Sequence, residues 1–158
     1  MFSRLPPALY VCPAVGVLLV YLPWQLLRYD PWVQHGLLTL APYSGVVLCI
    51  AGVTLVFSGA YYLGHRGGNT SIFTAPHRLV VAGPYGHIQH PILLGLLLIL
   101  FGEALWLCSP TVGVYDSLLA FLLHLYILCV EEPRLENRFG ADYRAYRTAI
   151  PRWFPRHF

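Results

Sequence analysis

One group of residues able to carry chemistry is a short polar run directly before a long apolar stretch. Residues 83–91 read GPYGHIQHP, and they combine turn-forming residues with Tyr85, His87 and His90. Pro91 suits the first position of a helix, where its missing N–H costs no hydrogen bond, and His90 then takes the capping position. The unpaired N–H groups and positive dipole end of that helix attract an anion such as a carboxylate. An ordinary capped helix start, with Tyr85 and His87 as interfacial anchors, is the alternative.

A second group, Glu131 and Glu132, directly follows another apolar stretch. Residues 91–107 and 112–130 are separated only by a short Ser-Pro-Thr turn, so we expect them to form an antiparallel hairpin. In that hairpin, residues whose numbers add up to about 219 lie level with each other, because both helices rise equally per residue. His90 then lies within about a turn of both glutamates. The sequence therefore predicts a polar cleft at the mouth of the hairpin, reachable from water and from lipid.

Other reactive side chains lie inside the apolar stretches. The same register places Glu103 level with Asp116, and ionisable groups at such depth are functional candidates by default. Mutual pairing explains these two carboxyls as well, so we expect structural roles for them and for His124. The four cysteines lie within or at the ends of apolar stretches without Cys-x-x-Cys spacing, which is typical of small core residues. No metal site is predicted.

The composition indicates a membrane protein. Of the 158 residues, 57% are hydrophobic and only 11% are charged, and the mean hydropathy is +0.59. Soluble proteins carry about 25% charged residues. We therefore predict an all-α integral membrane protein, formed by a single membrane domain over residues 1–158, and exclude a soluble dinucleotide-binding domain and a large repeat transporter. The net charge of +3 gives no indication of nucleic-acid binding.

About four transmembrane helices fit the apolar stretches, since each needs about 20 residues to cross the bilayer. The predicted spans are residues 8–27, 43–64, 91–107 and 112–130. We expect the first to be a span and not a cleavable signal peptide, because only Arg4 precedes it and no small-x-small site follows. The second contains small residues that let helices approach closely in lipid: Gly45, Gly52, Ser58 and Gly59.

The arginines fix the expected orientation, because short cytoplasmic segments carry the excess of positive charge. Arg28 stands alone between the first two spans, and the other nine arginines fall on the opposite side. They are Arg4, Arg66, Arg78, Arg134, Arg138, Arg144, Arg147, Arg152 and Arg156. Both termini, the loop at residues 65–90 and the tail at residues 131–158 are therefore predicted to be cytoplasmic. The expected location is a bacterial inner membrane or an endomembrane.

The tail has the pattern of a C-terminal amphipathic interfacial helix. Apolar side chains recur at spacings of three and four residues: Leu135, Phe139, Tyr143, Tyr146 and Ile150. We expect this helix to begin at Glu132 and Pro133, to lie on the membrane surface or over the loop, and to break or bend at Gly140. The aromatic and basic residues after Pro151 predict interfacial anchoring or a lid.

Several short blocks occur together and in order. They are His77-Arg78-Leu79-Val80, Gly83-Pro84-Tyr85, His90-Pro91 with Gly95, Glu131-Glu132 with Leu135, Phe139-Gly140, Tyr143, Tyr146 and Pro151-Arg152. This pattern, over roughly residues 70–156, resembles the isoprenylcysteine carboxyl methyltransferase family and its phospholipid methyltransferase relatives. The apolar stretches before it match only in kind.

The resemblance implies an integral membrane methyltransferase that binds S-adenosyl-L-methionine at the cytoplasmic face and methylates a lipid-like or small amphiphilic acceptor. By position it implies cofactor contacts at His77, Arg78, Leu79, Val80, Tyr85, His90, Pro91, Ile92, Leu93 and Glu131. Methyl transfer from a sulfonium requires no metal, and the protein mainly binds, aligns and dehydrates the partners. A neutral amine acceptor would have to lose a proton, and His90, His87 or Glu132 could then serve as the base.

Three positions depart from the family pattern. Gln89 replaces an Arg before the His-Pro pair, Leu93 replaces a Tyr, and Ile127 replaces an Arg one turn before the first Glu. Since Ile127 cannot hold a carboxylate by a bidentate pair, we expect a prenylcysteine carboxylate to be excluded as acceptor. Two other functions remain open: an NADPH-dependent membrane reductase of related architecture, and a diverged, non-catalytic interaction protein. The oligomeric state is not indicated.

Overall fold

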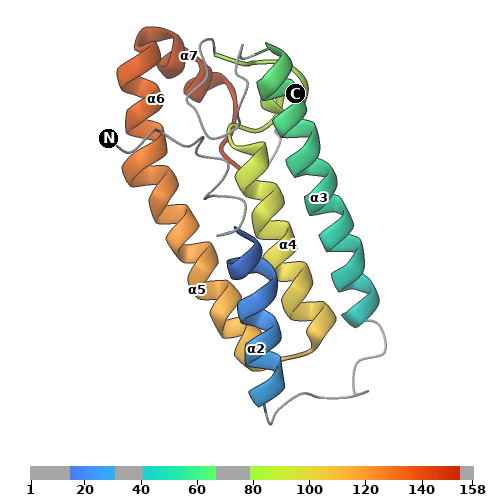
Figure 1. Cartoon of the computed structure of the whole chain (residues 1–158). Coiled ribbons are helices and arrows are strands. Elements are labelled where there is room, and N and C mark those ends of the chain that lie inside the picture. Colours follow the sequence, from blue (N-terminus) through green and yellow to red (C-terminus); the bar gives the residue numbers. More distant parts are fainter. Residues whose placement is uncertain (1–14, 31–40, 67–78, 154–158) are drawn as a thin grey trace, which may run out of the picture.

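The computed structural model describes residues 15–30, 41–66 and 79–153, and every regular element in these ranges is helical (Figure 1). The predicted all-α class is confirmed for this part of the chain. Two helical stretches are long and apolar enough to cross a membrane, residues 42–66 and 110–139. The apolar helix α4 (Pro91–Leu107) has 17 residues, and the first predicted span is described only from residue 15. Four spans therefore stay a prediction.

Helices α3 (Ala41–Arg66) and α4 pack with their backbones in close contact. A Cβ built on Gly45 would lie 2.5 Å from the carbonyl oxygen of Gly102, and one on Gly52 would lie 2.5 Å from that of Gly95. Gly59 continues the same stripe against α4. The predicted role of these glycines in close helix approach is thus confirmed. Ser58 instead donates its hydroxyl hydrogen bond to a carbonyl of its own helix.

Helix α4 and helix α5 (Pro110–Tyr126) form the predicted antiparallel hairpin (Figure 1). Helix α4 ends at Cys108, whose φ of 49° is left-handed, and α5 begins at once. The Ser109 hydroxyl accepts a hydrogen bond from the Val112 N–H at 3.2 Å and donates one to the carboxylate of Asp30. The turn is therefore tighter than predicted, because Ser109 caps a helix that already includes Pro110.

A helical segment begins at Glu132 with Pro133 in its first turn, as predicted, but it is not separated from the helix before it. Helix α5 continues through a π-helical turn, η3 (Ile127–Glu131), into α6 (Glu132–Phe139), and the backbone stays right-handed helical throughout. Pro133 lacks the N–H of a regular helical bond, and the wider π-turn accommodates this interruption. The first described helix also joins a π-helical turn to an α-helix that has a proline in its first turn. The π-helical turn η1 (Val17–Tyr21) ends two residues before Pro23, and α2 (Leu22–Tyr29) follows it directly.

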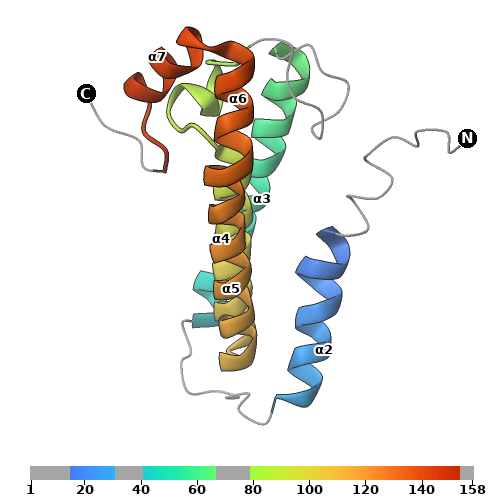
Figure 2. The same cartoon turned by 90° about the vertical axis from the view of Figure 1, so that its left-hand side faces the viewer.

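The chain reverses at Gly140, as predicted, and α7 (Ala141–Ala149) folds back over the hairpin mouth (Figure 2). The predicted apolar stripe is confirmed as one cluster that holds α6, α7 and the loop together. Its members are Tyr143, Tyr146 and Ile150, with Leu79, Leu135 and Phe139 packed against them.

Gly140 adopts φ 54° and ψ −120°, a combination that is accessible in practice only to glycine. We expect Gly140→Ala to lower the free energy of unfolding by about 1–2 kcal/mol through backbone strain alone, because the added Cβ meets nothing within 4 Å. Denaturant unfolding in detergent measures this. Gly16→Ala is the control, since that Cβ also meets nothing within 4 Å while φ is −61°. Equal effects of the two substitutions would contradict the strain argument.

The arginines of the described residues segregate as predicted. Arg66 ends α3 at the same end of the bundle as α6 and α7, whereas Arg28 lies at the opposite end, near the hairpin turn (Figure 1). Arg4, Arg78 and Arg156 lie outside the described residues. The assignment of the arginine-rich end to the cytoplasm stays a prediction.

Candidate active site at the hairpin mouth

The imidazole of His90 lies between two carboxylates. Its Nδ1 is 3.5 Å from Glu131 Oε1, and its Nε2 is 3.8 Å from Glu132 Oε1. His90 is the N-cap of α4, Pro91 occupies the first turn, and the His90 side chain is only 3% exposed. The hairpin register deduced from the sequence is therefore confirmed for these three residues.

The two neighbouring glutamates reach one imidazole from the junction of the π-turn and α6. Consecutive side chains of a regular α-helix diverge by about 100°, which would direct one carboxylate away from His90. Here η3 ends at Glu131, α6 starts at Glu132, and the two carboxylates face different nitrogens of the same ring. Single π-turns occur frequently at functional sites.

Glu132 is the buried member of the pair, with 5% of its side chain exposed. Arg152 contacts both of its oxygens: Nε lies 2.7 Å from Oε1, and Nη2 donates a hydrogen bond to Oε2 at 3.1 Å. Arg147 Nη1 lies 3.7 Å from Oε2. Two guanidinium groups therefore meet one carboxylate, and Glu132 is already neutralised within the chain.

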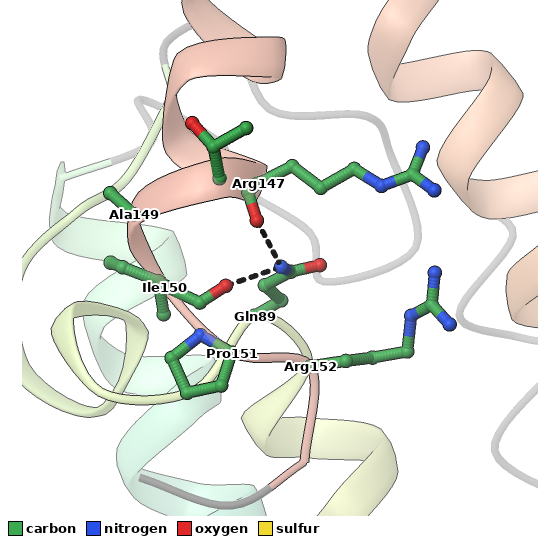
Figure 3. A pocket seen from close by; sticks show the side chains of 7 residues that line it. Gln89, Arg147, Ala149, Ile150, Pro151 and Arg152 are labelled. Atoms are coloured by element: carbon green, nitrogen blue, oxygen red, sulfur yellow. Dashed lines mark hydrogen bonds between the residues drawn. The ribbon is translucent and has the colours of Figure 1, made fainter. Parts of the chain in front are cut away.

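Gln89 forms hydrogen bonds to the tail beside this ion pair (Figure 3). Its side-chain amide donates hydrogen bonds to the carbonyls of Arg147, at 3.2 Å, and Ile150, while its backbone N–H donates to the Pro151 carbonyl at 3.2 Å. A hollow of about 220 Å³ adjoins these contacts and is lined by Gln89 and residues 147–152. The sequence showed Gln89 only as a departure from a family pattern, and the tail contacts were not predicted.

Glu131 is more accessible, with 31% of its side chain exposed, and Tyr85 is its neighbour. Burial, together with the charge of Glu131, raises the pKa of Tyr85 above its usual value of 10.0, so the phenol stays protonated and can donate a hydrogen bond. Tyr85 lies in the short 3₁₀ helix η2 (Gly83–Gly86), and its carbonyl accepts a hydrogen bond from the Tyr146 hydroxyl at 2.8 Å. Burial and the Glu132 charge likewise raise the pKa of Tyr143 to about 12.

The remaining residues predicted to contact the cofactor differ in their burial and in the residues that they contact. Leu79 packs against the tail cluster, Val80 is buried, and Ile92 lies against Gly59 of α3. Pro91 is fully buried and Leu93 is half-buried. His77 and Arg78 lie outside the described residues.

Deeper ionisable groups lie away from the hairpin mouth. Glu103 and Asp116 interact electrostatically, in agreement with the predicted register, and Asp116 is 2% exposed.

The His124 ring lies 5.8 Å from that of Trp153, which places the tail against α5. Cys49, Cys108 and Cys129 are free thiols, and Cys12 lies outside the described part of the chain. In that part, no group of three or more His, Cys, Asp or Glu side chains could hold a metal.

Fold and site together define a helical membrane protein with an imidazole–carboxylate centre where its helices meet a polar tail. A family model described as phospholipid methyltransferase matches residues 40–142 of the chain, well over half of its length. The chain belongs to this family.

Individual relatives agree with this assignment. The chain is 26% identical over 128 residues to human protein-S-isoprenylcysteine O-methyltransferase and 25% identical over 126 residues to the mouse protein of the same name. Each match covers 78% of this chain and 44% of the relative, so the chain spans less than half the length of these proteins. An uncharacterized protein of Haemophilus influenzae is 33% identical over 60 residues, which is 38% of this chain and 95% of that protein.

Proposed function

We propose that the protein is an S-adenosyl-L-methionine-dependent methyltransferase that acts on a lipid-like acceptor at the cytoplasmic face of a membrane. The observation that carries the proposal is the contact between His90 and Glu131 at the hairpin mouth, within the segment that the family model matches. Two helices long and apolar enough to cross a membrane support a membrane location, from which an acceptor would reach this contact through the bilayer.

The residues present suit such a cofactor. His90 Nε2 has no hydrogen-bond partner among the residues that the structure describes, and Glu131 keeps an accessible carboxylate beside it. Glu131 can accept hydrogen bonds from hydroxyl or ammonium groups of the cofactor. The positive N-terminus of α4 favours the carboxylate of the cofactor. When bound, S-adenosyl-L-methionine supplies an electrophilic methyl group on a sulfonium.

The side chains bind, align and exclude water, since the electrophile needs no further activation. Where the acceptor must lose a proton, His90 is the better placed base, because Glu132 is held by Arg152 and Arg147. Burial of His90 and Glu132 keeps this side of the centre dry and strengthens the electrostatic contacts there.

Ile127 restricts the acceptor. This residue is fully buried at the start of the π-turn and offers no cation to a carboxylate. We therefore propose a lipid-like or amphiphilic acceptor whose nucleophile is not a prenylcysteine carboxylate.

Calorimetry on the detergent-purified protein tests the proposal. We expect saturable binding of S-adenosylhomocysteine at one site and no binding of NADPH. A second experiment measures the transfer of a labelled methyl group from S-adenosyl-L-methionine to acceptors in lipid vesicles. The vesicles contain either phosphatidylethanolamine or a prenylcysteine with a free carboxylate. Tight NADPH binding would instead support a reductase, and binding of neither compound would support a non-catalytic role. Rapid methylation of the prenylcysteine carboxylate would contradict the restriction assigned to Ile127.

A further inference from the structure

The charge of Glu132 is compensated by a part of the chain far from it in sequence. A buried carboxylate is costly unless it is paired, and the pair here comes from Arg152 in the segment after α7. The guanidinium donates one hydrogen bond, from Nη2 to Oε2, and its Nε lies 2.7 Å from Oε1 as an ion-pair contact. Because Glu132 also faces His90, the tail changes the electrostatic surroundings of the imidazole.

Gln89 determines where Arg152 can lie. Its side-chain amide and backbone N–H donate hydrogen bonds to three carbonyls, those of Arg147, Ile150 and Pro151. All three lie within the five residues before Arg152. Gln89 is 6% exposed and is the direct neighbour of His90 in the chain. In Figure 3 the guanidinium groups of Arg147 and Arg152 extend on the side where the Gln89 amide oxygen points.

We infer that Arg152, held over Glu132 by Gln89, is a positioning residue that acts through Glu132 and gives the two adjacent glutamates different roles. Glu132 is neutralised by the tail, and Glu131 remains as the carboxylate available to a ligand. Without Arg152, His90 would face two carboxylates, only one of which retains a nearby guanidinium. The part of this inference that concerns the ligand rests on the proposed function.

The charged groups around His90 make the effect measurable. The imidazole is faced by Glu131 of η3 and Glu132 of α6, and the guanidinium groups of Arg147 in α7 and Arg152 act through Glu132. Tyr85 of η2 interacts electrostatically with Glu131 and is uncharged. Removing Arg152 leaves an under-compensated carboxylate 3.8 Å from Nε2, so His90 takes up its proton at a higher pH. We expect a shift of about 1 pH unit, because the positive charge of Arg152 is lost while the Glu132 carboxylate stays beside the ring.

NMR titration of histidine-labelled protein, with the His90 signal assigned by its loss in His90→Gln, tests the inference. We expect Arg152→Ala to raise the titration midpoint by about 1 pH unit. The double variant Arg152→Ala/Glu132→Gln should return to within about 0.3 of wild type, since it removes both charges. Arg144→Ala is the matched control, because this α7 arginine is 66% exposed and pairs with Glu136. It should leave the midpoint unchanged.

Two further variants keep the test decisive. Gln89→Met, similar in size but without the amide donor, should shift the midpoint in the same direction as Arg152→Ala. Where Arg152→Ala does not fold, Arg152→Gln removes the charge but keeps a donor and should still raise the midpoint. An unchanged midpoint in the arginine variants, or a double variant shifted as far as the single one, would overturn the inference.

Ligand binding separates this inference from the proposed function. By calorimetry, we expect Arg152→Ala to weaken the binding of S-adenosylhomocysteine about 3- to 10-fold. The double variant should recover most of this lost affinity. Failure of the wild type to bind S-adenosylhomocysteine overturns the proposed function, whereas the NMR cycle then still decides on the coupling of Arg152 to His90. Weakened binding without any midpoint shift would assign Arg152 a merely structural role.

Discussion

Substitution of Gly52 by Ala is expected to separate helices α3 and α4. The added Cβ would lie 2.5 Å from the Gly95 carbonyl oxygen and 3.0 Å from the Ile99 nitrogen, and these backbone atoms cannot move independently of the helix. Overpacking of this kind costs about 1–3 kcal/mol, and we expect the upper end of that range here. Because α3 also contacts Ile92 and Pro91 at Gly59, the loosened packing should displace the N-terminus of α4 and weaken ligand binding.

Gly113→Ala is the matched control for this effect. Gly113 lies in α5, and its added Cβ would meet only the Ala104 Cβ at 4.0 Å, an ordinary contact. Since Ala favours a helix over Gly by about 1 kcal/mol, we expect a neutral or stabilising effect. Unfolding of both variants in the same detergent gives the comparison. If Gly52→Ala were as stable as Gly113→Ala, the close contact between α3 and α4 would be wrong.

Substitutions at His90 and Glu131 are expected to have the largest effect on cofactor binding. Glu131→Gln keeps the size of a partly exposed side chain but loses the charge, so we expect S-adenosylhomocysteine binding to weaken about 10-fold or more, as for one charge-assisted hydrogen bond. His90→Ala removes the group that lies between both glutamates, and we expect a loss of at least the same size. Calorimetry measures both, with thermal unfolding as the check on folding.

Glu103→Gln is the control for the position of the site. Glu103 is ionisable and lies in the same helix as the His90 cap, but its electrostatic partner is Asp116, nearer the opposite end of the hairpin. We expect binding to be nearly unchanged. A loss equal to that of Glu131→Gln would place the binding site away from the hairpin mouth.

The sequence allowed the hairpin and the contact of His90 with the two glutamates to be predicted because local signals determined both. The His90 cap and Pro91 mark the start of α4, Cys108 ends it, and the bounds agree with the predicted residues 91–107. With the turn length known, helical rise alone determined that His90 meets the glutamates. The glycine stripe was predictable for the same reason, since its seven-residue spacing places Gly45, Gly52 and Gly59 on one face.

The errors arise where one residue type has two structural uses. Pro133 was interpreted correctly as lying in the first turn of a helical segment, but the π-turn that joins this segment to the helix before it was missed, as was the similar turn before Pro23. A proline two residues after such a turn gives no separate signal in the sequence. The contacts of Gln89 and Arg152 are separated by about sixty and twenty residues from their partners and depend on the reversal at Gly140, so no local pattern could predict them.

If the proposed function holds, the continuous helical stretch from Pro110 to Phe139 also sets the depth at which an acceptor must react. From Pro110 to Glu131 it rises about 32 Å at 1.5 Å per residue, close to the roughly 30 Å thickness of the hydrocarbon layer. When Pro110 lies at one boundary of that layer, Glu131 and His90 lie at the other. A nucleophile must then sit at the junction of acyl chains and headgroups to be reached. Acceptors would thus be selected by the distance between their reactive atom and their anchored tail as well as by chemistry.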